Sequence, residues 1–172
     1  MSVALTPSRV AAHAPVTSRL TPARLQALPA AYVHPGQLVV SADVGVLTTI
    51  LGSCVAVSLY DPARAIGGIN HYLLPRGASD SESARFGAVA LPRLLRELLG
   101  LGAAKPDLLA KVFGGASVLE GASGGLGRAN VAVALSFLDA QGIPVVARHT
   151  GGTRGRKLIL QTSTGVVWLK TL

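Results

Sequence analysis

The middle of the chain holds one cysteine and one histidine of the types that cleave amide bonds. Cys54 is the only cysteine, and it follows Gly52-Ser53 at the start of an apolar run. A glycine and a serine at this point allow a sharp entry into a strand, which leaves backbone N–H groups free near the sulfur. Such groups lower the pKa of a thiol and can hold an oxyanion. The alternative is a small buried hydrophobe, because free cysteine is among the most buried residue types.

His71 lies in the next apolar run along the chain. If the two runs form consecutive antiparallel strands, Cys54 and His71 lie side by side, as a thiolate–imidazolium pair requires. The imidazole can then protonate the leaving amine, which is the harder part of cleaving an amide. The alternative is a histidine that serves only packing or the surface.

A third group has to orient the imidazole. Thr48 and Thr49 lie just before Gly52-Ser53, and a threonine oxygen or a backbone carbonyl can accept a histidine N–H. β-Propensity explains either threonine equally well, so the residues alone leave the choice open. Asp43 and Asp61 are acidic alternatives, although both have the sequence context of turn residues.

Apolar runs and turn signals predict a strand-rich chain with two helices. The predicted strands are 38–41, 46–50, 54–60, 65–73, 109–113, 143–147, 157–162 and 166–170. Leucines spaced by three and four predict a helix that ends at Gly100 and either begins or kinks at Pro92. A second helix is predicted over 130–140, after a Gly-rich loop at 120–128. This order predicts an α/β fold, a layered, sandwich-like mixed β-sheet assembly with two helices packed on one side.

Length and composition bound the organisation of the chain. The 172 residues suffice for one domain, and the 49% of apolar residues argue against disorder over most of it. Residues 1–36 carry no acid and show no sustained period, so we predict a disordered tail at 1–36 and a single domain at 37–172. A lone cysteine fits a reducing compartment, and no apolar run is long enough to span a bilayer. The cytoplasmic location that we expect is implied by the family resemblance described below.

The formal net charge of +8 favours an acidic partner, with solubility alone as the other explanation. The cluster of Arg148, Arg154, Arg156 and Lys157 is either a solvated loop or a contact for such a partner. The few aromatic residues argue against a platform for single-stranded nucleic acid. Gly121–Gly127 lacks the Lys-Ser/Thr of a nucleotide loop.

A metal site is not predicted. One cysteine and two histidines outside the tail cannot complete a four-ligand site without carboxylates.

Several motifs together resemble the family of chemoreceptor glutamine deamidases called CheD. The cysteine lies in TTILGSCVAV at 48–57, a YDP turn follows at 60–62, and the histidine lies in GGINHYLLP at 67–75. The likeness continues through 110–116, 126–130 and 151–157, and it covers roughly residues 36–171. The cysteine and histidine motifs in this order and spacing are highly specific.

The resemblance implies a layered cysteine-hydrolase fold and the deamidation of glutamines on the methylation helices of chemoreceptors. By motif position it implies catalytic roles for Cys54, His71 and Thr48, with no metal or organic cofactor. The backbone at Ser53 and Gly52 is expected to support the oxyanion. Two further residues of the motifs, Asn70 and Arg156, are expected to contact the substrate.

The implied reaction passes through a thioester on the cysteine and releases ammonia. The implied partners are chemoreceptors and, as in some family members, a CheC-type phosphatase, with no nucleic acid and no insertion into a membrane. Some members also demethylate receptors. The alternative function is a non-catalytic module that binds a receptor or a phosphatase. Two departures from the family pattern, Pro92 and His149, lie outside the catalytic motifs.

Overall fold

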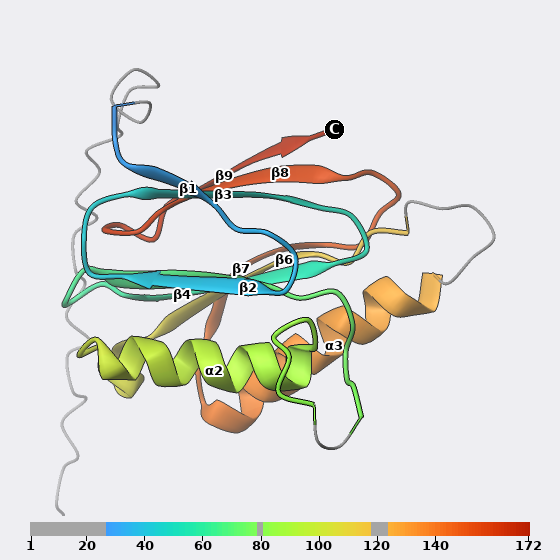
Figure 1. Ribbon diagram of the computed structural model, residues 1–172, viewed down its shortest axis with the longest axis horizontal. Helices are drawn as coiled ribbons and strands as arrows, with labels where there is room; N and C mark the ends of the chain where they lie inside the picture. The colour runs from blue at the N-terminus through green and yellow to red at the C-terminus, as the bar shows by residue number, and fades with distance from the viewer. Residues whose placement is uncertain (1–26, 79–80, 118–123) are drawn as a thin grey trace, which may run out of the picture.

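The computed structural model describes residues 27–78, 81–117 and 124–172. Within these residues, two β-sheets stack face to face, and the two α-helices cover the outer face of the larger sheet (Figure 1). The four-stranded sheet has the order β1 (Ala30–Tyr32), β3 (Val46–Leu51), β8 (Arg156–Gln161) and β9 (Val167–Thr171). The five-stranded sheet has the order β2 (Gln37–Ser41), β5 (Ile66–His71), β4 (Val55–Asp61), β6 (Leu109–Gly114) and β7 (Val145–Thr150).

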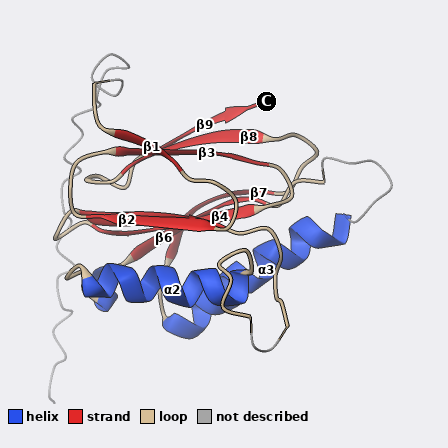
Figure 2. Ribbon diagram, in the orientation of Figure 1, coloured by secondary structure: helices blue, strands red, loops and turns tan. Residues whose placement is uncertain are grey.

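Both sheets are mixed. The pairs β1–β3 and β6–β7 are parallel, and the remaining neighbours are antiparallel. The helices α2 (Gly87–Gly100) and α3 (Gly124–Gln141) lie side by side against the five-stranded sheet, and a short 3-10 turn (Lys105–Asp107) precedes β6 (Figure 2). The predicted α/β class, with layered mixed sheets and two helices on one side, is confirmed.

Strand β4 runs through the centre of the molecule and is buried on both faces. Val55, Val57 and Leu59 point to the helices, whereas Ala56 points to the four-stranded sheet. This double burial explains the nearly continuous apolar run in the sequence, which is typical of strands covered on both sides. The site described below lies on the inter-sheet face of this strand.

Helix α2 begins earlier than the leucine pattern alone indicates. It starts at Gly87 and runs through Pro92, with Leu91, Leu94 and Leu98 buried against the sheet. Since Pro92 lacks an N–H, the helix gives up one backbone hydrogen bond there, near its first turn.

The predicted boundary between tail and domain at residue 36 lies too far along the chain. Residues 30–32 form β1, which pairs in parallel with β3, and the Val33 side chain is fully buried between the sheets. The remainder of the predicted tail, residues 1–26, lies outside the described residues.

The predicted Gly-rich loop at 120–128 is wrong for its second half, because α3 already begins at Gly124. The first part of that loop, up to residue 123, lies outside the described residues. Across the described ranges, none of the helices combines the length and apolar character needed to cross a membrane.

Candidate active site

Strand register brings Cys54 and His71 to the same face of the five-stranded sheet. Strands β4 and β5 are antiparallel, as predicted, with Ser58 opposite Ile69 and an isolated bridge between Val55 and Tyr72. This register sets Ala56 opposite His71. Cys54, two residues before Ala56, packs into the same inter-sheet cluster. Cys54 and His71 are therefore diagonal cross-strand neighbours on one face of the sheet, a spacing across which an aromatic ring such as the imidazole can reach.

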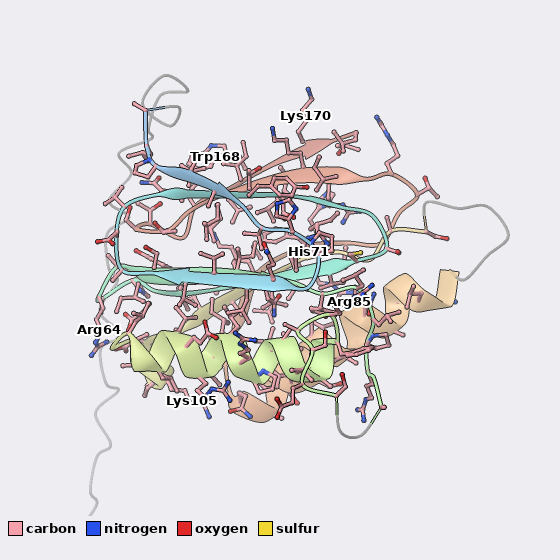
Figure 3. The ribbon with its side chains drawn as sticks, in the orientation of Figure 1. Arg64, His71, Arg85, Lys105, Trp168 and Lys170 are labelled. Atoms are coloured by element: carbon pink, nitrogen blue, oxygen red, sulfur yellow. The ribbon has the colours of Figure 1, made fainter. Side chains whose placement is uncertain are left out.

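His71 is held from the opposite sheet (Figure 3). Its Nδ1 lies 2.9 Å from Thr49 Oγ1 on β3 and 3.4 Å from the Val33 carbonyl oxygen. Thr49 Oγ1 itself donates to the Val33 carbonyl at 2.8 Å. Both side chains are buried, Thr49 at 0% and His71 at 1% exposure.

These contacts favour one tautomer of the neutral imidazole. The Thr49 hydroxyl has one proton, and it is given to the Val33 carbonyl, which can only accept. The hydroxyl must therefore accept from Nδ1–H of His71. In the neutral ring, Nε2 then bears the lone pair. Nε2 is buried without a hydrogen-bond partner among the described residues, so it is free to take a proton from a nucleophile.

Thr48 lies away from His71 in the structure. Its Oγ1 donates to the Leu158 carbonyl at 3.0 Å on the neighbouring strand, and its partner across β1 is Tyr32. Successive strand residues face opposite sides of a sheet. The two adjacent threonines therefore diverge, and the contact with His71 belongs to Thr49.

All three carbonyls of the turn before and at the cysteine are occupied. The Gly52 oxygen accepts from Ala116 N at 2.8 Å, the Ser53 oxygen from Asn130 Nδ2 at 3.1 Å, and the Cys54 oxygen from Gly115 N at 2.8 Å. Because the peptide group is planar, a hydrogen bond to its carbonyl also fixes the direction of its N–H. The Gly52-Ser53 turn is therefore held by hydrogen bonds from the loop after β6 and from α3.

Gly114, at the end of β6, has to be a glycine. It has a φ of +107°, and a Cβ at this position would lie 2.1 Å from the Cys54 carbonyl oxygen. Only glycine adopts this φ without strain and allows so close an approach. The close approach positions β6 and its loop directly against the cysteine turn.

Burial governs the titration of both reactive groups. It raises the pKa of the Cys54 thiol, and the cysteine's own backbone N–H opposes this only in part. Burial likewise lowers the pKa of His71; the Val33 carbonyl opposes that shift and the nearby His34 adds to it. Burial therefore shifts both pKa values toward the neutral forms, and for the thiol this is opposite to the lowering expected from the sequence.

Comparison with known proteins identifies the family. The family model described as CheD chemotactic sensory transduction matches residues 73–171. A protein of Anaeromyxobacter dehalogenans named probable chemoreceptor glutamine deamidase CheD 1 is 48% identical over 143 residues, 82% of this chain and 84% of that protein. A Rhodospirillum rubrum protein named probable chemoreceptor glutamine deamidase CheD is 44% identical over 150 residues, 86% of this chain and 85% of that protein. The chain belongs to the CheD family.

A crystal structure of a Neisseria meningitidis protein matches 74% of this chain and 64% of its own, with 13% identity and a TM-score of 0.42. That likeness is too distant to bear on the CheD site.

Asn70 does not face the site in this CheD-family chain. It is fully buried on the face of β5 opposite to His71, and its Oδ1 accepts from Val57 N at 2.9 Å. The regular β4–β5 pairing ends at Ser58 and Ile69. The Asn70 side chain replaces the missing backbone acceptor, so its place in the structure is architectural rather than substrate-facing.

Arg156 is also turned inward. It is 3% exposed and pairs across β3 with Leu51. Its guanidinium donates to the carbonyls of Gly114 (3.2 Å), His149 and Gly151, at the ends of β6 and β7. The predicted substrate contact of Arg156 is therefore replaced by a clamp between the two sheets beside the cysteine turn.

Other members of the predicted basic cluster lie at the surface. Arg148 Nε donates to Thr150 Oγ1 at 2.8 Å, and Arg154 Nε donates to the Leu172 carbonyl at 2.7 Å. Lys157 is exposed on β8. Within the described residues, no group of three or more His, Cys, Asp or Glu side chains could hold a metal ion.

Reasoning from the sequence missed two parts of the site. The Val33 carbonyl was assigned to the tail, because Ala30-Ala31-Tyr32 carries no strand signature. Asn130 was noted only as part of a CheD-like motif at 126–130, because the sequence gives no sign of which backbone groups a buried amide on a helix will reach.

Proposed function

We propose that this CheD-family protein converts glutamine side chains of chemoreceptors to glutamate, acting in the cytoplasm, with Cys54 as nucleophile and His71 as proton carrier. Thr49, together with the Val33 carbonyl, holds the imidazole. Two kinds of observation support the proposal. The relatives named above carry the name chemoreceptor glutamine deamidase, and the residues at the site have the chemistry that the reaction needs.

The observation that carries the proposal is the arrangement of His71. Its Nδ1–H is fixed by Thr49, while its buried Nε2 has no partner among the described residues. A buried polar atom without a partner costs about 1–3 kcal/mol. A free ring nitrogen on the face shared with the only cysteine is what a general base for a thiol requires.

The reaction begins from neutral groups. As Cys54 Sγ attacks the carbonyl carbon of the glutamine amide, its proton passes to His71 Nε2, and the C=O electrons move to the oxygen. The resulting oxyanion is held by backbone N–H groups at the Gly52–Cys54 turn. His71 then donates the proton from Nε2 to the amide nitrogen. The C–N bond breaks, ammonia leaves, and an acyl thioester remains on Cys54.

Hydrolysis of the thioester completes the cycle. A water molecule gives one proton to His71 Nε2 and adds its oxygen to the thioester carbon. Collapse of the second oxyanion expels the Cys54 thiolate, which recovers the proton from His71. The products are a glutamate side chain and the resting enzyme, so the cycle consumes one water and releases one ammonia.

A basic groove next to the site supports an acidic substrate segment. It has a volume of about 310 Å³ and lies between α3 and the end of β7, with Arg128 and Arg148 on its walls and no acidic side chain among the described residues that line it. Gly115 lines this groove and also donates to the Cys54 carbonyl. A segment rich in carboxylates could therefore occupy the groove while its glutamine reaches the cysteine.

The test is mass spectrometry on a chemoreceptor cytoplasmic fragment incubated with the wild-type protein or with Cys54→Ala. Deamidation adds about one dalton per glutamine, since an amide NH2 becomes OH. We expect a gain at defined glutamines with the wild type and none with the variant. Arg154→Ala, which changes an exposed residue outside the proposed site, serves as the control and should retain activity.

Absence of any gain with a cognate receptor, while the protein is folded and Cys54 is reduced, would refute the deamidase. The remaining function would then be a non-catalytic module that binds the receptor or a CheC-type phosphatase, which a pull-down with the two purified partners detects.

A further inference from the structure

Asn130 is a buried side chain that reaches both reactive strands. It lies on α3, is 0% exposed, and its Nδ2 donates to the Ser53 carbonyl at 3.1 Å and to the Leu73 carbonyl at 2.8 Å. Ser53 directly precedes the cysteine, and Leu73 lies two residues beyond His71. One amide group therefore ties the turn of the nucleophile to the strand extension of the imidazole.

The orientation of this amide is fixed by its neighbours. Both carbonyls can only accept, so the NH2 group must face them, and Oδ1 is left buried without a partner among the described residues. An unsatisfied buried acceptor is costly. The backbone carbonyl of Asn130 is used separately, accepting from the Tyr72 hydroxyl at 2.6 Å. The side chain thus donates hydrogen bonds to two carbonyls, while its own oxygen has no partner among the described residues.

The bond to Ser53 determines where the next N–H points. The Ser53 carbonyl and the Cys54 N–H belong to one trans peptide plane and point in opposite directions. Since Asn130 draws the carbonyl toward α3, the Cys54 N–H is directed away from the helices, to the inter-sheet side where the Cys54 sulfur packs. That is the side on which a tetrahedral oxyanion would form.

We infer that Asn130 is a positioning residue for the reaction: it aims the Cys54 N–H at the oxyanion and keeps the turn in register with the strand of His71. This inference rests on the proposed deamidase function. Asn130 touches neither substrate nor sulfur, so it acts through the peptide group between Ser53 and Cys54.

The experiment compares Asn130→Ala with Tyr72→Phe. The first variant removes both hydrogen bonds that the Asn130 side chain donates. The second removes only the hydrogen bond from the Tyr72 hydroxyl to the Asn130 backbone carbonyl and leaves the Asn130 side chain in place. For each folded protein, four quantities are measured: kcat and KM for deamidation of a receptor fragment, the melting temperature, and the rate at which iodoacetamide alkylates Cys54. Alkylation displaces iodide and forms no oxyanion, so its rate depends on the accessibility and ionisation of the sulfur and not on stabilisation of an oxyanion.

For Asn130→Ala we expect kcat to fall about 10- to 100-fold, somewhat less than the 10²–10³-fold loss on outright removal of an oxyanion donor. KM and the alkylation rate should stay close to wild type. Tyr72→Phe should lower the melting temperature and leave kcat nearly unchanged. If Asn130→Ala does not fold, Asn130→Ser carries the test, because its hydroxyl can serve only one of the two carbonyls and should lower kcat by a smaller factor.

Three outcomes would overturn the inference: an unchanged kcat in the Asn130 variant, an equal loss of kcat in Tyr72→Phe, or a loss of alkylation that parallels the loss of kcat. The last would mean that the whole turn had moved. Failure of the wild type to deamidate any receptor glutamine is a different result, because it refutes the proposed function itself. The wild type is therefore assayed before any variant is compared with it.

Discussion

The two layers between the sheets and helices differ in what they bury. The layer between the five-stranded sheet and the helices is broad and apolar, with Leu91, Leu94 and Leu98 of α2 against Val57 and Leu59 of β4. The layer between the two sheets holds a smaller apolar cluster. It also takes in Thr49, His71 and the half-buried Cys54, together with an imidazole nitrogen that has no partner among the described residues.

Strand β4 separates these layers and belongs to both. Its alternate residues pack with the helices on one side and line the site on the other. The contrast teaches that the helix layer supplies most of the hydrophobic stabilisation, whereas the inter-sheet layer holds polar groups at some energetic cost so that they can react. Changes in the two layers should therefore have separable effects on stability and on turnover.

The largest effect is expected from a cavity in the helix layer. Leu94→Ala should lower the free energy of unfolding by about 2–5 kcal/mol, because it removes a fully buried side chain from a packed core. Turnover per folded molecule should stay near wild type. Urea denaturation and kcat at a temperature where the variant is folded test both parts. A fall in kcat as large as that of a site variant would break the contrast between the layers.

The next largest effect is expected at the two threonines. There, substitution should change the activation free energy of the reaction at one position and not at the other. Thr49→Val should lower kcat by roughly 10- to 100-fold, the usual loss when a hydrogen-bond partner that fixes a functional imidazole is removed. Thr48→Val, the matched change one residue away, should leave kcat close to wild type. Steady-state kinetics on a receptor fragment distinguish them. Equal losses in both variants would show that Thr49 does not hold His71 in the working enzyme.

The smallest effect is expected from mild acid. The unfolded chain binds a proton on His71 near its ordinary pKa of about 6.5, while burial lowers the pKa in the folded protein. Between these values the unfolded state binds more protons, so stability is full above about pH 7 and falls as the pH drops toward the folded pKa. Urea denaturation between pH 7 and pH 5 should show a steeper decline for the wild type than for His71→Gln. Parallel declines would contradict the burial of a neutral imidazole.

The strands and helices were largely predictable because their signals are local. The β-branched runs around Val57 and Ile159 and the leucine spacing in α2 each follow from a few neighbouring residues. β1 was missed because Ala30-Ala31-Tyr32 has no such signal; it becomes a strand only through pairing with β3. Pairings of this kind depend on tertiary context, which outweighs intrinsic propensity.

Within the site, residue types were predictable and directions were not. Cys54 and His71 were singled out by their residue types and by the family motifs, and the antiparallel strands place them on one face. The motif spacing selected Thr48, whereas the contact with His71 belongs to Thr49, and only the packing of the two sheets shows this. Arg156 was expected at the surface for its charge, yet its register with Leu51 directs it between the sheets.

The short β1 strand is a segment next to the site that can open locally. It has three exposed residues at the edge of its sheet, and the Val33 carbonyl that holds Thr49 and His71 follows directly after it. Edge segments of this size open locally at a much lower free energy than global unfolding. Each such opening would release the imidazole while the core stays intact, so that a fraction of the molecules would be folded but inactive. The Val33 amide donates to the Thr48 carbonyl at 2.8 Å, so its rate of hydrogen exchange would measure the fraction of molecules in the open, inactive state.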